Sequence, residues 1–240
     1  MIELIWTLVP VLLGVVASPL AVIALVAVLL SQNARRNGVT FLLGWSGAVL
    51  VSVLLGYWLF GWLQVDLDAA AQPWVPYVRL GAGVLLAVGA VWTYRRSKAK
   101  IRLMAAASSP KDVVEAAPQL PGWLHSIDAF TAQRSLALGL GIFLLNPINV
   151  SCALIAALDI RLAGLEGTVS WTFVAVFVLL SIAPMAVPVY LVLAKGAQAE
   201  PFLAALRSWI AAHNGTLSTV FLGIIAFMQI QKALEAFAWV

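Results

Sequence analysis

Long apolar runs separated by short polar segments are the dominant pattern of this chain. Each run approaches or exceeds the roughly 20 residues that a helix needs to cross the hydrocarbon core of a bilayer. We therefore predict an all-α membrane protein with six transmembrane helices. The predicted spans are Ile5–Leu30, Val39–Leu63, Tyr77–Tyr94, Ser135–Leu158, Val169–Ala194 and Leu217–Phe237.

Two of these spans contain a polar residue followed by proline, Ser18-Pro19 in the first and Asn146-Pro147 in the fourth. Proline has no N–H and leaves the carbonyl about one turn earlier without its partner. In lipid, each backbone polar group needs a partner within the protein. Nearby Asn and Ser side chains can supply that partner, or they can offer the same polar atoms to a substrate. The polar-Pro pairs are therefore consistent with either a structural kink or a binding site.

The position of the two pairs indicates an internal repeat. Three spans, a long loop and three further spans follow one another, and each polar-Pro pair lies in the first span of its set. Units with an odd number of spans insert in opposite orientations, as in secondary transporters whose broken helices form a midplane substrate site. We predict two inverted three-helix repeats, 1–94 and 135–240, joined by a cytoplasmic linker, 95–134. The predicted substrate-binding residues are Ser18, Pro19, Asn146, Pro147, Asn149 and Ser151.

The fifth span carries a second proline pattern. Pro184 and Pro188 are four residues apart and follow Ser181. Prolines at this spacing bend or loosen a helix. These three residues are candidates for a moving gate, and a static kink is the alternative.

Charged residues in the loops predict the orientation. The segments 31–38 and 95–134 are rich in Arg and Lys, whereas 64–76 carries acids and no base. Basic loops are retained in the cytoplasm. We therefore expect both termini on the outer side of the membrane.

Two loop stretches have an apolar face at helical spacing. Gly122–Arg134 presents Trp123, Ile127 and Phe130 on one face, and Pro201–His213 repeats the pattern before Asn214-Gly215. Such helices lie in the membrane interface. We predict two interfacial helices, with simple packing at the interface as the alternative role.

Composition agrees with a membrane protein and narrows its chemistry. The 240 residues are 63% hydrophobic and 10% charged, far from the usage of soluble domains. Arg79 and Asp159 lie near span ends, where we expect them to reach the interface. We expect no enzyme activity, no metal and no cofactor, because no nucleophile–base pair, ligand cluster or nucleotide motif is apparent. A path lined by Ser, Thr, Asn, Gln and apolar groups suits a neutral or amphiphilic substrate.

The six-span layout, ASPLAVIALVAVLL followed by SQNARRNGVTFLLGW, and NPIN in the fourth span resemble the Gap family. These are the peptidoglycolipid addressing proteins of mycobacteria and other actinobacteria, within the LysE-type translocator superfamily. The resemblance implies a plasma-membrane protein that helps to export glycolipids toward the cell surface.

Two other functions remain open at this point. One is efflux of a small neutral or zwitterionic solute such as an amino acid, and the other is an accessory subunit that scaffolds a lipid-export machine. The partners implied are membrane lipids and a glycolipid substrate, with a lipid synthase or larger exporter as a further possibility. A homo-oligomer is open, and no nucleic acid is expected.

Overall fold

The computed structural model describes residues 1–16, 18–63, 74–106 and 131–238, and its regular elements there are helices. The helices are α1 (Ile2–Val16), α2 (Pro19–Leu29), α3 (Ala34–Trp62), α4 (Val75–Ala106), α6 (Ala132–Leu144), α7 (Pro147–Leu162), α8 (Gly167–Lys195), the short 3₁₀ helix η3 (Gly196–Ala199) and α9 (Glu200–Ala238).

Four helical segments are long and apolar enough to cross a membrane by themselves. They are Ala34–Trp62, Val75–Lys98, Gly167–Lys195 and Gly215–Phe237. Two further spans are possible if each bent pair counts as one: α1 and α2 are inclined by 48°, and α6 and α7 by 67°. The all-helical membrane fold is therefore confirmed, with four to six candidate spans, a range that includes the predicted six.

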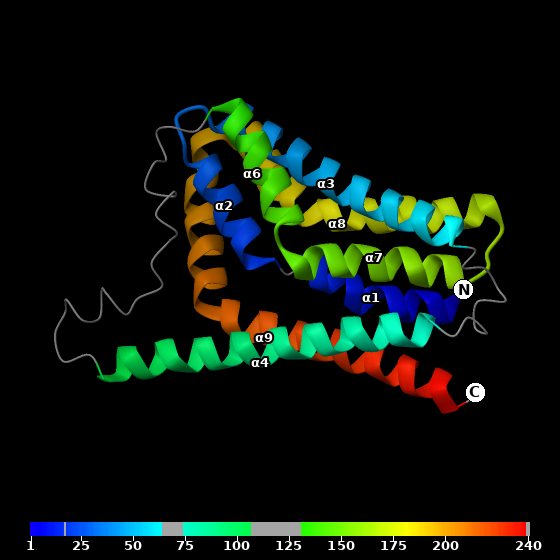
Figure 1. Cartoon of the computed structure of the whole chain (residues 1–240). Coiled ribbons are helices and arrows are strands. Elements are labelled where there is room, and N and C mark those ends of the chain that lie inside the picture. The colour runs from blue at the N-terminus through cyan, green and yellow to red at the C-terminus, as the bar shows by residue number, and fades with distance from the viewer. Residues whose placement is uncertain (17, 64–73, 107–130, 239–240) are drawn as a thin grey trace.

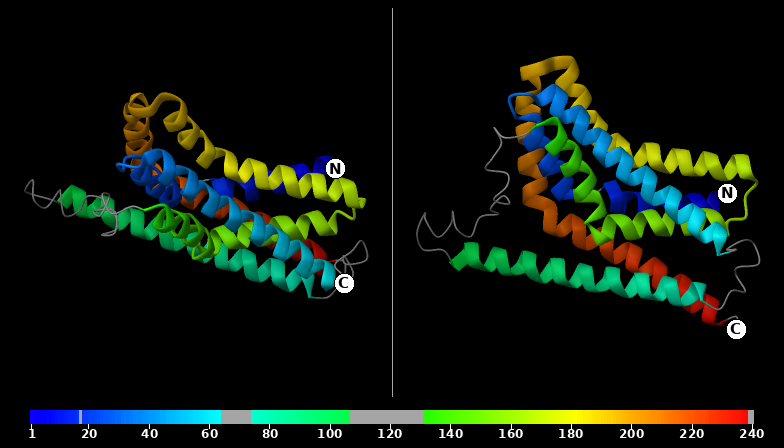
Figure 2. Two further views of the ribbon diagram at one scale, coloured as in Figure 1. Left: turned by 90° about the horizontal axis from the view of Figure 1, so that it is seen from above. Right: turned by 45° about the horizontal axis from the view of Figure 1, so that its top comes forward.

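The helices pack in pairs that bring distant parts of the chain together (Figure 1). α4 lies along the second half of α9, α1 lies against α7, and α3 contacts α6, α7 and α8. α2 and the first half of α9 cross one end of the molecule, while both termini lie at the opposite end (Figures 1 and 2). The two bent pairs thus contact each other, α1 with α7 and α2 with α6.

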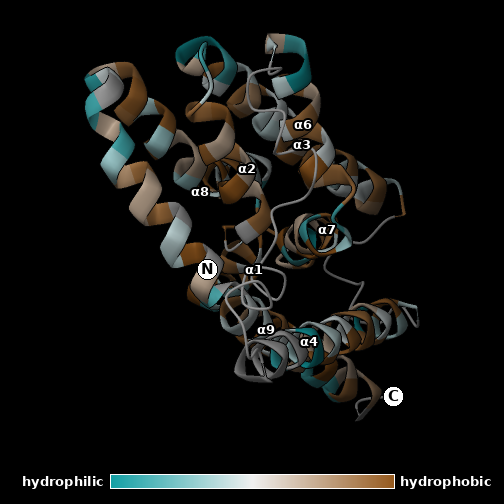
Figure 3. Ribbon diagram, turned by 90° about the vertical axis from the view of Figure 1, so that its left-hand side faces the viewer, coloured by the Kyte–Doolittle hydropathy of each residue, from teal (hydrophilic) through white to brown (hydrophobic). Residues whose placement is uncertain are grey.

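The outer surface of the long helices is apolar. Large hydrophobic side chains on α3, α4 and α8 are exposed, among them Leu55 (59%), Val88 (63%) and Leu179 (66%). Figure 3 shows brown, hydrophobic ribbon along the helix flanks and teal at the helix ends that face the viewer. An exposed apolar surface this extensive marks contact with lipid or with a partner. Conversely, α2 is buried on all sides from Ala21 to Leu29.

α3 and α6 cross at very short range because glycine faces backbone on both sides. A Cβ at Gly44 would collide with the carbonyl oxygen of Leu136, and one at Gly139 would collide with the carbonyl oxygen of Phe41. Small residues permit this close approach between helices in membranes. Beside the crossing, the rings of Trp45 and Phe143 pack edge to face at 5.1 Å.

Three boundaries differ from the sequence-based expectation. α3 begins at Ala34, so Arg35 lies in its first turn rather than in a loop, and α4 continues twelve residues past Tyr94 to Ala106. The expected helix end before Asn214-Gly215 is wrong, because α9 runs through it. Gly215 instead lets α9 lie against Ser97 of α4, where a Cβ would collide with the serine hydroxyl.

Two predicted features stay untested by the fold. Most of the expected interfacial helix Gly122–Arg134 lies outside the described residues. The segment Pro201–His213 is helical as the first part of α9, and Figure 1 shows that α9 changes direction beyond it.

The α3–α6 crossing gives a test with a matched control two residues away. Gly139→Ala should lower the melting temperature of the purified protein, because overpacking a well-packed site costs about 1–3 kcal/mol. Gly141→Ala should leave it unchanged or raise it, because nothing lies within 4 Å of a Cβ there and Ala favours helix over Gly by about 1 kcal/mol. Equal effects of the two substitutions, measured by thermal unfolding in detergent, would refute the close crossing.

Candidate functional site

Both polar-Pro pairs mark the start of a helix rather than a kink within one. Pro19 begins α2 and Pro147 begins α7, where a missing N–H is tolerated because the first helical N–H groups have no partner in the helix. The Asn146 side chain caps α7, since its Oδ1 accepts a hydrogen bond from the Ile148 N–H at 3.0 Å. Asn146 therefore serves the backbone of its own helix, and α6 and α7 diverge around it.

Ser18 precedes Pro19 in the same way but makes a different contact. Its side chain does not cap α2. Instead Ser18 Oγ accepts a hydrogen bond from Asn149 Nδ2 at 3.4 Å, across 131 residues of sequence. The two helix breaks are therefore joined side chain to side chain in the middle of the protein. We call this contact, with Asn146 beside it, the polar seam.

The polar seam has a hydrogen-bond acceptor with no partner. Ser18 is 3% exposed and Asn149 is 1% exposed. Among the described residues, nothing donates to Asn149 Oδ1. A buried polar group left unsatisfied costs about 1–3 kcal/mol. The arrangement thus suits a donor that arrives from outside the chain, either water or a ligand hydroxyl.

A small cavity of about 50 Å³ opens beside the polar seam. It is bounded by α1, α7 and α9, and its lining residues are Gly14, Ser18, Asn146, Ile148, Asn149, Ser218, Phe221 and Leu222. This volume holds a few water molecules and no sugar ring. The structure therefore has the seam in a closed form, which a larger group can enter only if the surrounding helices separate.

The other predicted binding residues lie outside this cavity. Pro147 is exposed, and Ser151, one turn further along α7, is half-buried. Neither lines the cavity, and the side chain of Pro19 is outside what the structure describes. Of the predicted set, the structure thus brings Ser18, Asn146 and Asn149 together.

The predicted gate residues lie within one continuous helix. α8 contains both Pro184 and Pro188, and it changes direction in its second half, toward η3 (Figure 2). The carbonyl oxygen of Ser181 accepts a hydrogen bond from Trp45 Nε1 at 3.4 Å, while the Ser181 hydroxyl is buried without a partner among the described residues. Because Trp45 is fully buried, this contact ties α8 to α3 just before the prolines.

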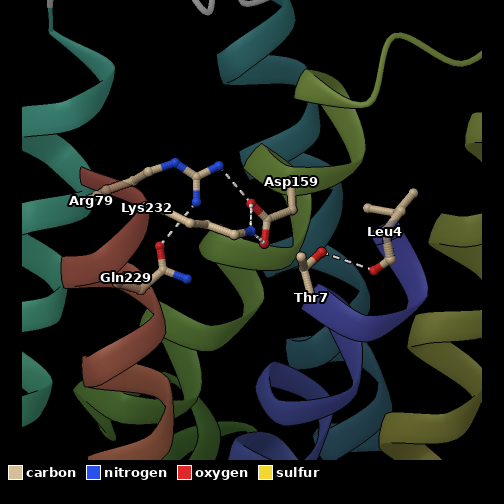
Figure 4. Close-up of polar contacts among 6 residues, drawn as sticks. All are labelled: Leu4, Thr7, Arg79, Asp159, Gln229 and Lys232. Atoms are coloured by element: carbon tan, nitrogen blue, oxygen red, sulfur yellow. Dashed lines mark hydrogen bonds and ion pairs between the residues drawn. The ribbon is translucent and has the colours of Figure 1, made fainter. Parts of the chain in front are cut away.

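An ionic cluster that sequence reasoning missed joins three helices (Figure 4). Arg79 of α4 donates to Asp159 of α7 at 2.7 Å and to Gln229 of α9 at 3.1 Å. Lys232 of α9 lies 3.3 Å from the same carboxylate. The side chains of Arg79 and Asp159 are 8% and 3% exposed. The expectation that these two residues reach the interface is therefore wrong.

The reason lies in how the helices pair. Arg79 is near the start of α4, whereas Asp159 and Lys232 are near the ends of α7 and α9, and the fold brings these three ends together (Figure 4). Arg79 and Asp159 are near span ends, as predicted, but both side chains are buried in the protein. Charged residues within membrane segments usually face the bundle and pair with one another. Applied to Arg79, Asp159 and Lys232, this rule could have predicted from the sequence that the three side chains pair with one another.

Comparison with known proteins identifies a family. A family model described as "Sap, sulfolipid-1-addressing protein" matches residues 8–235. No curated protein and no solved structure matches the chain. The model covers nearly the whole chain, including both helix breaks and the ionic cluster, and it confirms the resemblance to addressing proteins. Membership of the wider LysE-type superfamily stays a prediction.

The ionic cluster predicts strong coupling between two residues. Asp159→Asn should destabilise the protein by about 3–5 kcal/mol, because it leaves the buried Arg79 without a carboxylate. Arg79→Gln should cost less, because Lys232 remains beside Asp159. The double substitution should cost less than the sum of the two. Glu235→Gln, which alters an exposed carboxylate on the same helix as Lys232, should change stability by less than about 0.5 kcal/mol. Additive losses in a double-mutant cycle of unfolding would contradict a buried pair.

Proposed function

The chain belongs to the sulfolipid-1-addressing protein family, and from this premise we propose that it helps to carry an amphiphilic glycolipid across the plasma membrane toward the cell surface. The family description indicates a role in lipid export or addressing. Transport by the chain itself is our proposal, and the polar seam is the observation that carries it.

The polar seam supplies what a glycolipid headgroup needs. A sugar offers hydroxyl donors, and Asn149 Oδ1 is a buried acceptor without a donor among the described residues. Ser18 and Asn146 add polar atoms on the same cavity. Each hydrogen bond formed there would contribute about 0.5–1.5 kcal/mol net. The acyl chains would stay outside, along the exposed apolar flanks of the long helices.

We infer that the seam opens by movement of α1 and α2 relative to α7. The ionic cluster fixes α4, α7 and α9 to one another, so these helices form the rigid side of the cavity. α1 packs on α7 through apolar side chains, and the polar link between the first bent pair and α7 at the seam is one long hydrogen bond of 3.4 Å. The prolines of α8, which packs against both α1 and α2, would let that helix bend as they move.

The same contacts support an inverted repeat as the underlying design. Each half contributes one bent helix pair, one 29-residue helix and one longer helix. Corresponding helices contact one another: α3 contacts α8, and α4 contacts α9. A two-fold relation between the halves would place the two breaks at the axis, where the seam lies.

A deletion strain gives the test. Restoring the gene with Asn149→Leu should leave surface glycolipid up to about tenfold lower than the native gene does, because losing a hydrogen bond of about 1.4 kcal/mol weakens binding of the headgroup tenfold. Gln231→Leu, which removes an exposed amide of α9, should restore export fully. The measurement is lipid mass spectrometry of surface and inner-membrane fractions, with immunoblots to show equal amounts of membrane-inserted protein.

Three outcomes separate this function from its alternatives. Lipid that accumulates internally in the deletion strain supports the proposal, and movement of glycolipid by purified protein in liposomes extends it to transport without partners. A defect in cells without movement in liposomes identifies an accessory subunit. A normal surface lipid profile together with altered tolerance of an amino acid would overturn the lipid role.

A further inference from the structure

A second cavity, of about 630 Å³, lies at the end of the molecule opposite the termini. It is an open hollow lined by the α2–α3 turn, the end of α8, η3 and the start of α9. The lining residues are Leu29, Leu30, Ser31, Gln32, Asn33, Ala34, Arg35, Arg36, Val192, Gly196, Glu200 and Leu203. Its volume is within the range of pockets that bind small molecules, whereas the cavity at the polar seam admits only water.

The walls of this larger cavity are of two kinds. Leu29, Val192 and Leu203 give an apolar wall, and each is less than 5% exposed. The remaining lining residues include the turn 31–34, with Ser31, Gln32 and Asn33, followed by Arg35 and Arg36. Figure 3 shows the hydrophilic ribbon gathered at this end of the helices. A cavity lined by both apolar and positively charged side chains suits an amphiphile better than a free ion.

The two arginines are available for a ligand. Both are exposed in the first turn of α3, and no described carboxylate lies within ion-pair distance of either. Arg35 reaches across to the α8–η3 junction, where a Cβ on Gly196 would lie 3.7 Å from its Nη2. Glu200 lines the same cavity, so the lining side chains carry two positive charges against one negative.

We propose that this cavity binds the anionic headgroup of the amphiphile, with Arg35 and Arg36 holding a sulfate or phosphate group. The planar guanidinium matches tetrahedral oxyanions in a two-pronged geometry that lysine does not provide. The inference rests on the proposed function, and the family description, which names a sulfolipid, agrees with a negatively charged group.

The position of the cavity relative to the polar seam supports a two-station route. α2 begins at the seam, next to Ser18, and ends at the cavity, with Leu29. Its 11 residues span about 16 Å at 1.5 Å per residue. The anionic group is thus recognised at one end of α2, and the seam receives uncharged hydroxyls at the other. The arginines belong to the basic segment 31–38, which the sequence analysis assigns to the cytoplasm.

The test compares two lipids that differ only by one sulfate. Sulfatide and galactosylceramide are added to the full-length protein in detergent, and binding is measured by native mass spectrometry. The native protein should bind sulfatide at least about tenfold more tightly than galactosylceramide. Arg35→Gln/Arg36→Gln should abolish this preference, and Arg35→Lys/Arg36→Lys should restore only part of it.

The control removes the same charge elsewhere. Arg95 and Arg96 are an adjacent, exposed pair on α4 that does not line the cavity, so Arg95→Gln/Arg96→Gln should keep the full preference. An equal loss in both double variants, or no preference in the native protein, overturns the proposal. Tight saturable binding of inorganic sulfate alone would also overturn it, because the site would then recognise an ion and not an amphiphile.

The binding experiment tests the headgroup site independently of the proposed role in lipid export. If the sulfatide preference is absent while Asn149→Leu still blocks lipid export, the headgroup site fails and the seam stands. If the preference depends on Arg35 and Arg36 while the deletion strain exports its lipids normally, the binding site stands and the export role fails.

Discussion

Within a membrane, every backbone polar group needs a hydrogen-bond partner in the protein. This constraint determines how the two helix breaks at the centre of the protein are built. Pro19 and Pro147 interrupt the helical hydrogen bonds inside apolar stretches, and each is the first residue of a new helix, α2 and α7. Asn146 caps α7 with its own side chain, and Ser18 turns instead to Asn149 of the other bent pair. The breaks therefore place a polar seam in surroundings that are otherwise apolar. Among the described residues, Asn149 Oδ1 has no donor there, so it can accept a hydrogen bond from a ligand.

The remaining contacts divide the molecule into a firm part and a part that can move. Arg79, Asp159 and Lys232 hold α4, α7 and α9 together with buried charges, and Gly83 lets α4 approach α9 so closely that a Cβ would lie 3.1 Å from the Ile230 nitrogen. Such contacts resist rearrangement, because separating buried ions from their partners is costly. α1 and α2 meet the seam by apolar packing and one long hydrogen bond, from Asn149 to Ser18. Because these contacts involve no ion pair among the described residues, a route for a headgroup opens most readily on their side.

The sequence predicts those features that depend on local chemistry. Proline removes a hydrogen bond wherever it occurs, so the breaks at Pro19 and Pro147 could be located from their neighbours alone. Long apolar runs likewise predict the four long spans. What could not be predicted depends on pairing between distant helices. Arg79 and Lys232 look like span-end residues until the fold shows that they share Asp159, and Asn214-Gly215 looks like a helix end until Gly215 is seen packed on Ser97. Of the candidate site, the contact between Ser18 and Asn149 agrees with the expected meeting of the two breaks, whereas Ser151 and Pro147 lie apart from the cavity.

The central claim is that a lipid headgroup reaches the polar seam between the two broken helices. Photo-crosslinking in living cells tests it most directly: a lipid precursor that carries a diazirine near its headgroup is fed to the cells, and the adducts on the purified protein are mapped by mass spectrometry. The account predicts adducts around Ser18 on the first bent pair and around Asn149 on the second, lost when Asn149→Leu is introduced. Adducts confined to outward-facing positions such as Val88 and Leu179, with none at the seam, would contradict it.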